Sequence, residues 1–191
     1  MSGGSSQRRV VGALPVAAVL AAALCGPAWA GAPKWGAPEG EVRACVEKAA
    51  QAFEVEPIVI WTLLDVESGT VGKVSRNTNG TVDIGPMQIN SIHLPRLNKL
   101  GVSFEQLRDH LCTNINVGTW IFKQEYARTK NVAQAVASYH SRTPRHQARY
   151  LGLAVAALER RIARAQAEEA VTPPAPPPPS KPLYVPRPST L

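Results

Sequence analysis

The chain has 191 residues, among them 17 prolines and 3 cysteines, and carries a formal net charge of +7 at neutral pH. A modest excess of positive charge suits contact with an anionic polymer. No dense run of Lys and Arg interleaved with aromatic residues is present, so composition argues against a nucleic-acid partner. A cluster at Arg160, Arg161 and Arg164 is better explained as the solvated face of a helix.

Residues 1–30 have the features of an export signal. Arg8 and Arg9 form a basic start, residues 10–24 are apolar, and Ala28-Trp29-Ala30 fits the small-x-small cleavage pattern. The apolar stretch is shorter than the roughly 20 residues that span a bilayer. We therefore predict ordinary export, cleavage after Ala30 and a periplasmic or secreted protein.

Removal of these thirty residues, which include two Arg and no acid, leaves 161 residues and lowers the formal net charge to +5. That length is sufficient for one domain with a hydrophobic core. Two cysteines remain, Cys45 and Cys112. An even number of cysteines in an exported chain favours a disulfide, and these two allow one pairing. The alternative is two unrelated buried thiols.

Helical patterns dominate the predicted domain, residues 31–171. The first helix is expected over 39–53, and Pro57 opens the second, since proline is tolerated in the first helical turn. Ser103 and Gln106 have the spacing of a capping box. Further helices are expected from Thr113 or Asn114, from 132 to 140 after an Asn131 cap, and from 145 to 169 with an interruption at Gly152.

Two segments lack a helical pattern. Residues 71–84 contain several Gly and Asn residues that favour turns, with a short strand expected at Val82 and Ile84, and we predict a small lobe over a cleft. Residues 172–191 are rich in proline and are predicted to form an extended, disordered tail that serves as a ligand for a partner or as a passive spacer.

Glu67 is the strongest candidate for chemistry. It ends an apolar helical run whose side chains at 60, 61 and 64 share one face. Partial desolvation there disfavours the charged carboxylate, so the group can act as a general acid near neutral pH. Asp65 is the rival acid, but it lies two residues away, on a different face where we expect it to be solvated.

Three ordered segments carry a resemblance to a known family. They are Glu67-Ser68, the run from Asn77 to Asn90 with Gly85-Pro86-Met87-Gln88-Ile89-Asn90 at its end, and the run from Cys112 to Gly118. Over about residues 41–151 the chain resembles the soluble lytic transglycosylases, most closely the small exported members attached to conjugation and type IV secretion systems. The resemblance implies a mainly α (α+β) lysozyme-like fold of the goose-type kind and a peptidoglycan substrate.

The resemblance also implies roles for single residues. Glu67 is similar to the family's one catalytic acid/base, with Ser68 beside it, Met87 and Gln88 lining a glycan groove, and Tyr139 facing Glu67 across the cleft. The family often has Tyr-Asn-Ala-Gly in the last motif, whereas this chain reads Tyr139-His140-Ser141-Arg142. The departure leaves the neighbouring polar contact, at His140, unassigned.

Other readings of these residues remain open. Asp83 could be a second carboxylate, which would make the protein a hydrolysing lysozyme, although among Asn, Gly and Thr it is expected to fix a turn. A non-catalytic wall-binding assembly module is the other alternative. His140 and His146 lack a third ligand at zinc-type spacing, and Asn77, Asn79 and Asp83 lack the acidic positions of a calcium loop. We expect a monomer without metal or other cofactor.

Overall fold

The computed structural model of the chain describes residues 33–171. The predicted signal at residues 1–30 and the predicted proline-rich tail at 172–191 lie outside the described residues. Within them the elements follow the order η1 (Lys34–Gly36), α1 (Glu39–Phe53), α2 (Pro57–Glu67), β1 (Val74–Arg76), β2 (Val82–Ile84), β3 (Ile89–Asn90), η2 (Ser91–His93), α3 (Leu94–Lys99), α4 (Phe104–Asp109), α5 (Leu111–Thr129), α6 (Val132–His140) and α7 (Pro144–Val171).

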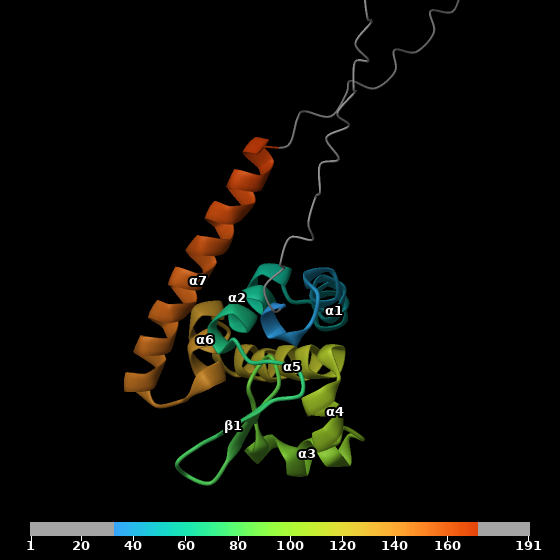
Figure 1. Cartoon of the computed structure of the whole chain (residues 1–191). Helices are drawn as coiled ribbons and strands as arrows, with labels where there is room; N and C mark the ends of the chain where they lie inside the picture. Colours follow the sequence, from blue (N-terminus) through green and yellow to red (C-terminus); the bar gives the residue numbers. More distant parts are fainter. Residues whose placement is uncertain (1–32, 172–191) are drawn as a thin grey trace, which may run out of the picture. The chain divides into compact units, whose positions relative to one another are not determined.

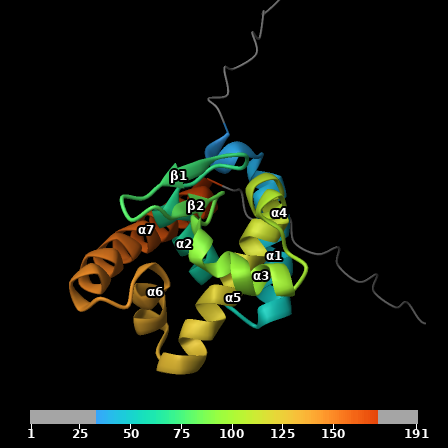
Figure 2. The same ribbon diagram turned by 90° about the horizontal axis from the view of Figure 1, so that it is seen from below.

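Helix α5 is the central element. In Figure 1, α1 and α2 lie on one side of it, and the small sheet with α3 and α4 lies on the other. In Figure 2, α6 and α7 lie on one side of the domain and α4 lies near the start of α5. Helix α6 packs against α5, whereas α7 packs against α6 and α2. The predicted mainly helical domain with a small β lobe is therefore confirmed.

Three helix starts follow from local signals in the sequence. Pro57 occupies the first turn of α2, and the Ser103 and Gln106 side chains form the predicted capping box of α4. The Asn131 side chain accepts from the Gln134 N–H at the start of α6. By contrast, α5 begins at Leu111, before the predicted start. No signal in the sequence marks this start, because the preceding His110 forms no side-chain cap.

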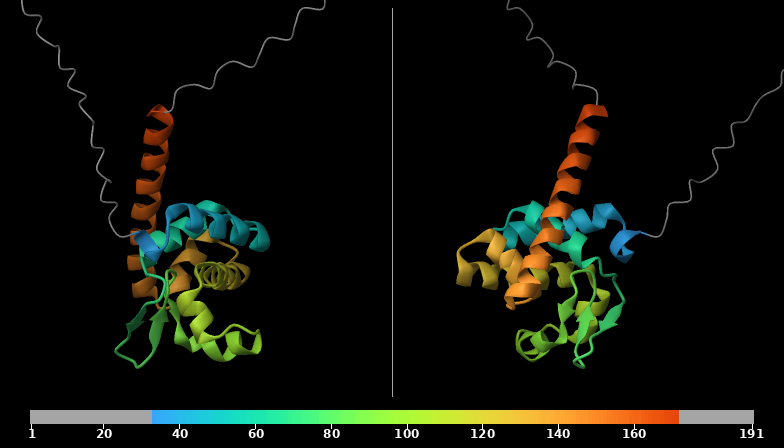
Figure 3. Two further views of the ribbon diagram at one scale, coloured as in Figure 1. Left: turned by 45° about the vertical axis from the view of Figure 1, so that its right-hand side comes forward. Right: turned by 90° about the vertical axis from the view of Figure 1, so that its left-hand side faces the viewer.

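The predicted interruption of the last helix is wrong, since α7 runs without a break from Pro144 to Val171. A glycine within a helix costs only about 1 kcal/mol relative to alanine, and burial of Tyr150, Ala154 and Ala157 on the same helix offsets that cost. The C-terminal part of α7 continues beyond α1 and α2, as both views of Figure 3 show. Its side chains from Glu159 onward are mostly exposed.

The β lobe is a three-stranded antiparallel sheet in the order β1-β2-β3. The strand predicted at Val82 and Ile84 is β2, with Asp83 between them paired to Ser75 on β1 and Asn90 on β3. Among these strand residues, Ile84 and Ile89 are buried. Strand β3 contacts α5, so this face of the sheet packs on the helical core.

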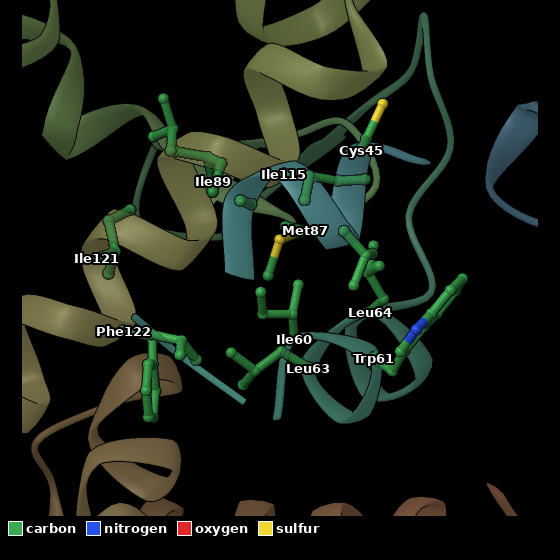
Figure 4. Close-up of a cluster of buried hydrophobic side chains, with 14 of the residues drawn as sticks. Cys45, Ile60, Trp61, Leu63, Leu64, Met87, Ile89, Ile115, Ile121 and Phe122 are labelled. Carbon is green, nitrogen blue, oxygen red and sulfur yellow. The ribbon is translucent and has the colours of Figure 1, made fainter. Parts of the chain in front are cut away.

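The core gathers around α2 and α5 (Figure 4). Ile60, Leu63 and Ile115 are fully buried, and Met87 is inserted between these helices from the β lobe. Gly118 on α5 allows this insertion, because a Cβ there would lie 2.4 Å from the Met87 sulfur. Met87 thus joins the lobe to the helical core.

The predicted disulfide is confirmed. Cys45 on α1 is bonded to Cys112 in the first turn of α5, with their Cα atoms 4.9 Å apart. The bond joins two helices that are separated by 67 positions in the sequence. No helix within residues 33–171 combines the length and the apolar character needed to cross a membrane.

Candidate functional site

Glu67 is the last residue of α2, and the chain turns sharply after it. Ser68 adopts a left-handed conformation with φ of 48°, and its N–H donates to the Leu64 carbonyl. The Ser68 hydroxyl donates to the Asp65 carbonyl at 2.6 Å. Ser68 therefore ends the helix and is exposed, but it lines neither of the two cavities that flank Glu67.

The Glu67 carboxyl is held in a largely buried position. Burial disfavours its charged form and, with a smaller contribution from the negative charge of Asp83, raises its pKa to about 7. The Tyr150 hydroxyl opposes this effect, because it donates a hydrogen bond to Glu67 Oε1 at 2.6 Å. At neutral pH the carboxyl is thus present in both protonation states.

Tyr139 and Glu67 line the same groove. The Tyr139 hydroxyl donates to the Met87 carbonyl oxygen at 2.8 Å. Its burial, and the charges of Glu67 and Asp83, raise the pKa of this phenol well above its usual value. The hydroxyl therefore remains neutral and fixes the backbone at Met87.

The Met87 side chain was predicted to line the groove, but it is not among the residues that do so. The side chain is fully buried because it fills the space over Gly118, and only the backbone of Met87 is left near Tyr139. Gln88 does line the groove. Its side-chain amide donates to the Gly85 carbonyl at 2.9 Å, which leaves the amide oxygen available to a ligand.

The groove beside Glu67 has a volume of about 580 Å³ and is mostly polar in its residues. Asn77, Asn79, Gln88 and Asn90 provide amides along it. Amides are suitable donors and acceptors for the hydroxyl and acetamido groups of a sugar chain.

Asp83 also lines this groove but is engaged by its neighbours. Asn77 donates to Asp83 Oδ2 at 3.0 Å, and Asn90 donates to Oδ1 at 2.7 Å. Both carboxylate oxygens thus help to organise the lobe, although Asp83 lies in strand β2 rather than in the expected turn.

Asn114, on α5, anchors the groove to the helical core. This fully buried side chain accepts from the Met87 N–H at 2.8 Å and donates to the carbonyls of Ile84 and Leu107. Gly85 is required beside it, because its φ is +67° and a Cβ would lie 2.3 Å from the Asn114 amide nitrogen. The motif from Gly85 to Asn90 therefore shapes the wall of the groove.

His140 and His146 both lie at the site. The His140 ring stacks on Tyr150 with centroids 4.8 Å apart and an angle of 6° between the planes. Burial, the main cause, lowers the pKa of His140. Residues 33–171 contain no group of three or more His, Cys, Asp or Glu side chains that could hold a metal ion.

Asp65 is not solvated as predicted. Its side chain is only 12% exposed and pairs with Lys34 and with Arg161, whose Nη2 lies 2.7 Å from Oδ2. Arg161 in turn lies over the Trp61 ring, 4.3 Å from its centroid, so this arginine of the predicted solvated face is largely covered. Through these two ion pairs, Asp65 on α2 links Lys34, near the start of the domain, with Arg161 on α7.

Tyr150 is the site residue that sequence reasoning missed. It lies 83 positions after Glu67 and is buried on the inner face of α7. Within a long amphipathic helix an inward tyrosine is typical of a core residue. The one signal in the sequence that could have identified Tyr150 is its spacing of four residues from His146, which puts both side chains on the same face of the helix.

These features define a small, mainly helical protein of the lysozyme-like kind, with one buried carboxyl between two cavities. Residues 44–151, more than half of the chain, match the family described as Transglycosylase SLT domain. The chain therefore belongs to the transglycosylase SLT domain family.

Several curated relatives are similar to this chain. It is 32% identical over 100 residues to Invasion protein IagB of Salmonella typhimurium (strain LT2), covering 52% of this chain and 62% of the relative. It is 33% identical over 106 residues to a peptidoglycan-binding-like protein of Escherichia coli O157:H7, covering 51% and 64%. Protein IpgF of Shigella flexneri is 29% identical over 100 residues, covering 52% and 66%. The matched region spans slightly less than two thirds of each relative.

Proposed function

We propose that this chain is an exported lytic transglycosylase that cleaves the β-1,4 bond between N-acetylmuramic acid and N-acetylglucosamine in peptidoglycan. The observation that carries the proposal is the Glu67 carboxyl, buried between two cavities with a pKa of about 7. The match of residues 44–151 to the transglycosylase SLT domain supports it.

Glu67 serves in both halves of the proposed reaction. The protonated carboxyl first donates its proton to the glycosidic oxygen, and the bond to the muramic acid C1 breaks as the N-acetylglucosamine hydroxyl leaves. The substrate's own acetamido group stabilises the cationic C1. The Glu67 carboxylate then removes the proton from the C6 hydroxyl of the same sugar, whose oxygen bonds to C1 and gives a 1,6-anhydro ring. The carboxyl is protonated again at the end.

Tyr150 holds the carboxylate oxygen in place through this cycle. Its hydroxyl donates to Oε1, which favours the charged form, while burial favours the neutral form. The balance suits a single group that must both give and take a proton.

Two other functions are weighed against this one. A hydrolysing lysozyme would use Asp83 as the second carboxylate, but its two oxygens accept hydrogen bonds from Asn77 and Asn90. A non-catalytic peptidoglycan-binding module is suggested by the name of one relative, the peptidoglycan-binding-like protein. The position of Glu67 between two cavities and its raised pKa favour chemistry over binding alone.

The proposed setting is local opening of the cell wall during assembly of a secretion or conjugation apparatus, by a monomer in the periplasm. The basis is the resemblance to the small exported transglycosylases, together with the similarity to Invasion protein IagB. Peptidoglycan is the proposed substrate, and the proline-rich segment at 172–191 is the proposed contact with the apparatus.

Substitution of Glu67 tests the proposed function. Glu67→Gln keeps the shape of the side chain but removes the transferable proton, so turnover on purified peptidoglycan should fall by at least about 100-fold. Asp83→Asn should keep turnover within roughly tenfold of wild type, because the loss of an acid/base is the larger effect. Thermal melts would verify that both variants fold. Equal, large losses in the two variants would favour the lysozyme reading, and full activity of Glu67→Gln would refute the assignment.

Truncation after Val171 tests the role of the proline-rich segment. The truncated protein should cleave isolated peptidoglycan at the wild-type rate, because residues 33–171 contain both cavities and Glu67. Loss of cleavage by a truncated protein that still folds would show that the segment contributes to the active site.

A further inference from the structure

A second cavity adjoins Glu67. It has a volume of about 440 Å³ and shares Glu67, His140 and His146 with the polar groove, so the two spaces meet at the carboxyl. Val66 and Leu153 give it apolar walls. It is formed by the end of α2, the end of α6 and the first turns of α7.

The chemistry of this cavity differs from that of the groove. The groove contains four Asn or Gln side chains, whereas the second cavity contains none and has His140, His146 and Arg149 around it. Glu67 is its one acidic residue. A ligand that fits here needs an apolar portion against Val66 and Leu153 and an anionic group near the basic side chains.

Arg149 is the permanent positive charge of the cavity, since a guanidinium stays protonated at any physiological pH. Among the nearby arginines, Arg142 and Arg128 pair with Glu125, and Arg161 pairs with Asp65. Within residues 33–171, Arg149 forms no ion pair with a carboxylate. It is exposed at the cavity and its fork of donors is free for a bidentate anion.

The proposed substrate contains such a ligand. In peptidoglycan the muramic acid carries, through its lactyl group, a short peptide with methyl side chains and free carboxylates. The neighbouring N-acetylglucosamine carries no peptide. We propose that the second cavity binds this stem peptide, with a peptide carboxylate on Arg149 and its apolar groups against Val66 and Leu153. This inference rests on the proposed function and specifies its substrate, namely glycan strands that keep their peptides.

Binding distinguishes this proposal from the cleavage reaction. Soluble glycan fragments of equal length, with stem peptides or stripped of them by an amidase, would be titrated calorimetrically into Glu67→Gln protein, in which turnover is slowed. The Glu67→Gln protein, the parent of the further variants, should bind the peptide-bearing fragment with the higher affinity. Adding Arg149→Ala should reduce that preference about tenfold, because a charge-assisted bidentate contact is lost.

Arg145→Ala is the matched control, since Arg145 is an exposed arginine of the same helix that lines neither cavity. This variant should keep the preference of the parent, and Arg149→Lys should keep part of it. Equal affinity of the parent for the two fragments would overturn the proposal. So would an Arg149→Ala variant that loses affinity for both fragments alike, because that result indicates a structural role. Neither result depends on whether the wild-type protein cleaves the strand.

Discussion

Two opposing effects act on the Glu67 carboxyl. Burial disfavours its charge, and the hydrogen bond from Tyr150, at 2.6 Å, favours it. Burial is the larger effect, so the pKa moves from 4.5 to about 7. A carboxyl fully committed to either form would serve one proton transfer well and the other poorly, whereas a pKa near the working pH serves both.

The raised pKa predicts a pH-dependent stability. Because the folded protein holds the Glu67 proton more tightly than the unfolded chain, this stabilisation is present below about pH 4.5 and is lost as the pH rises through about 7. The neutral side chain of Glu67→Gln avoids the loss. Denaturant unfolding at about pH 5 and about pH 8.5 should show the variant gaining on the order of 2–3 kcal/mol relative to wild type at the higher pH.

A stability difference between the two proteins that does not change with pH would contradict the buried position of Glu67. Asp65→Asn removes a carboxylate that is held between two cations, Lys34 and Arg161. This substitution should destabilise the protein, because it leaves the largely covered Arg161 without its carboxylate partner.

At the scale of elements, the β lobe depends on one side chain of α5. Asn114 makes hydrogen bonds to Met87, Ile84 and Leu107, which come from the groove wall, β2 and α4. The Tyr139 hydroxyl adds a bond from α6 to the Met87 carbonyl. The lobe that carries Asp83 and Gln88 is thus placed by contacts from two helices.

Asn114→Ala should therefore damage both stability and the site. Loss of the amide leaves a buried N–H and two buried carbonyls without this partner, and we expect the free energy of unfolding to fall by about 2–4 kcal/mol. Asn116→Ala, at an exposed position of the same helix, should change it by less than about 0.5 kcal/mol. Chemical denaturation of both variants checks this prediction, and similar values for the two would argue against the anchoring role.

Elements with local signals could be predicted from the sequence. Pro57, Ser103 and Asn131 each act through a neighbour at most a few residues away, and the helices that they open were identified. Strand β1 was missed because its three residues are exposed and show no alternation. Helix α3 was missed because it is as short as α4 but lacks a side-chain cap at its start. Short elements of this kind are determined by tertiary contacts, which a local pattern does not contain.

The same reasoning applies to the candidate site. Glu67 was found because its apolar helix and the following motif are contiguous in the sequence. Tyr150 and Arg161 were not assigned their roles, since each meets its partner across more than 80 positions. The sequence predicted that Met87 lines the groove. Its side chain instead packs in the core, where Gly118, which has no Cβ, leaves room for it.

At the scale of the whole molecule, the described domain contains a disulfide between α1 and α5. The export signal predicted at residues 1–30 precedes it in the sequence. A disulfide is suited to the oxidising environment outside the cytoplasm. The closed loop is long, and in the chain-entropy account such a bond contributes roughly 4 kcal/mol. Both features suit the location that we propose, the cell envelope.

The mass of the released sugar ends tests the central claim most directly. Purified protein would be incubated with isolated peptidoglycan, and the soluble products analysed by mass spectrometry, with Glu67→Gln protein as the control. The account predicts that wild-type protein releases products whose muramic acid ends are 1,6-anhydro sugars, lighter by one water than reducing ends, and that the variant releases almost none. Reducing ends from wild-type protein would identify a hydrolase, and no release by folded wild-type protein would identify a binding module; either result would contradict the account.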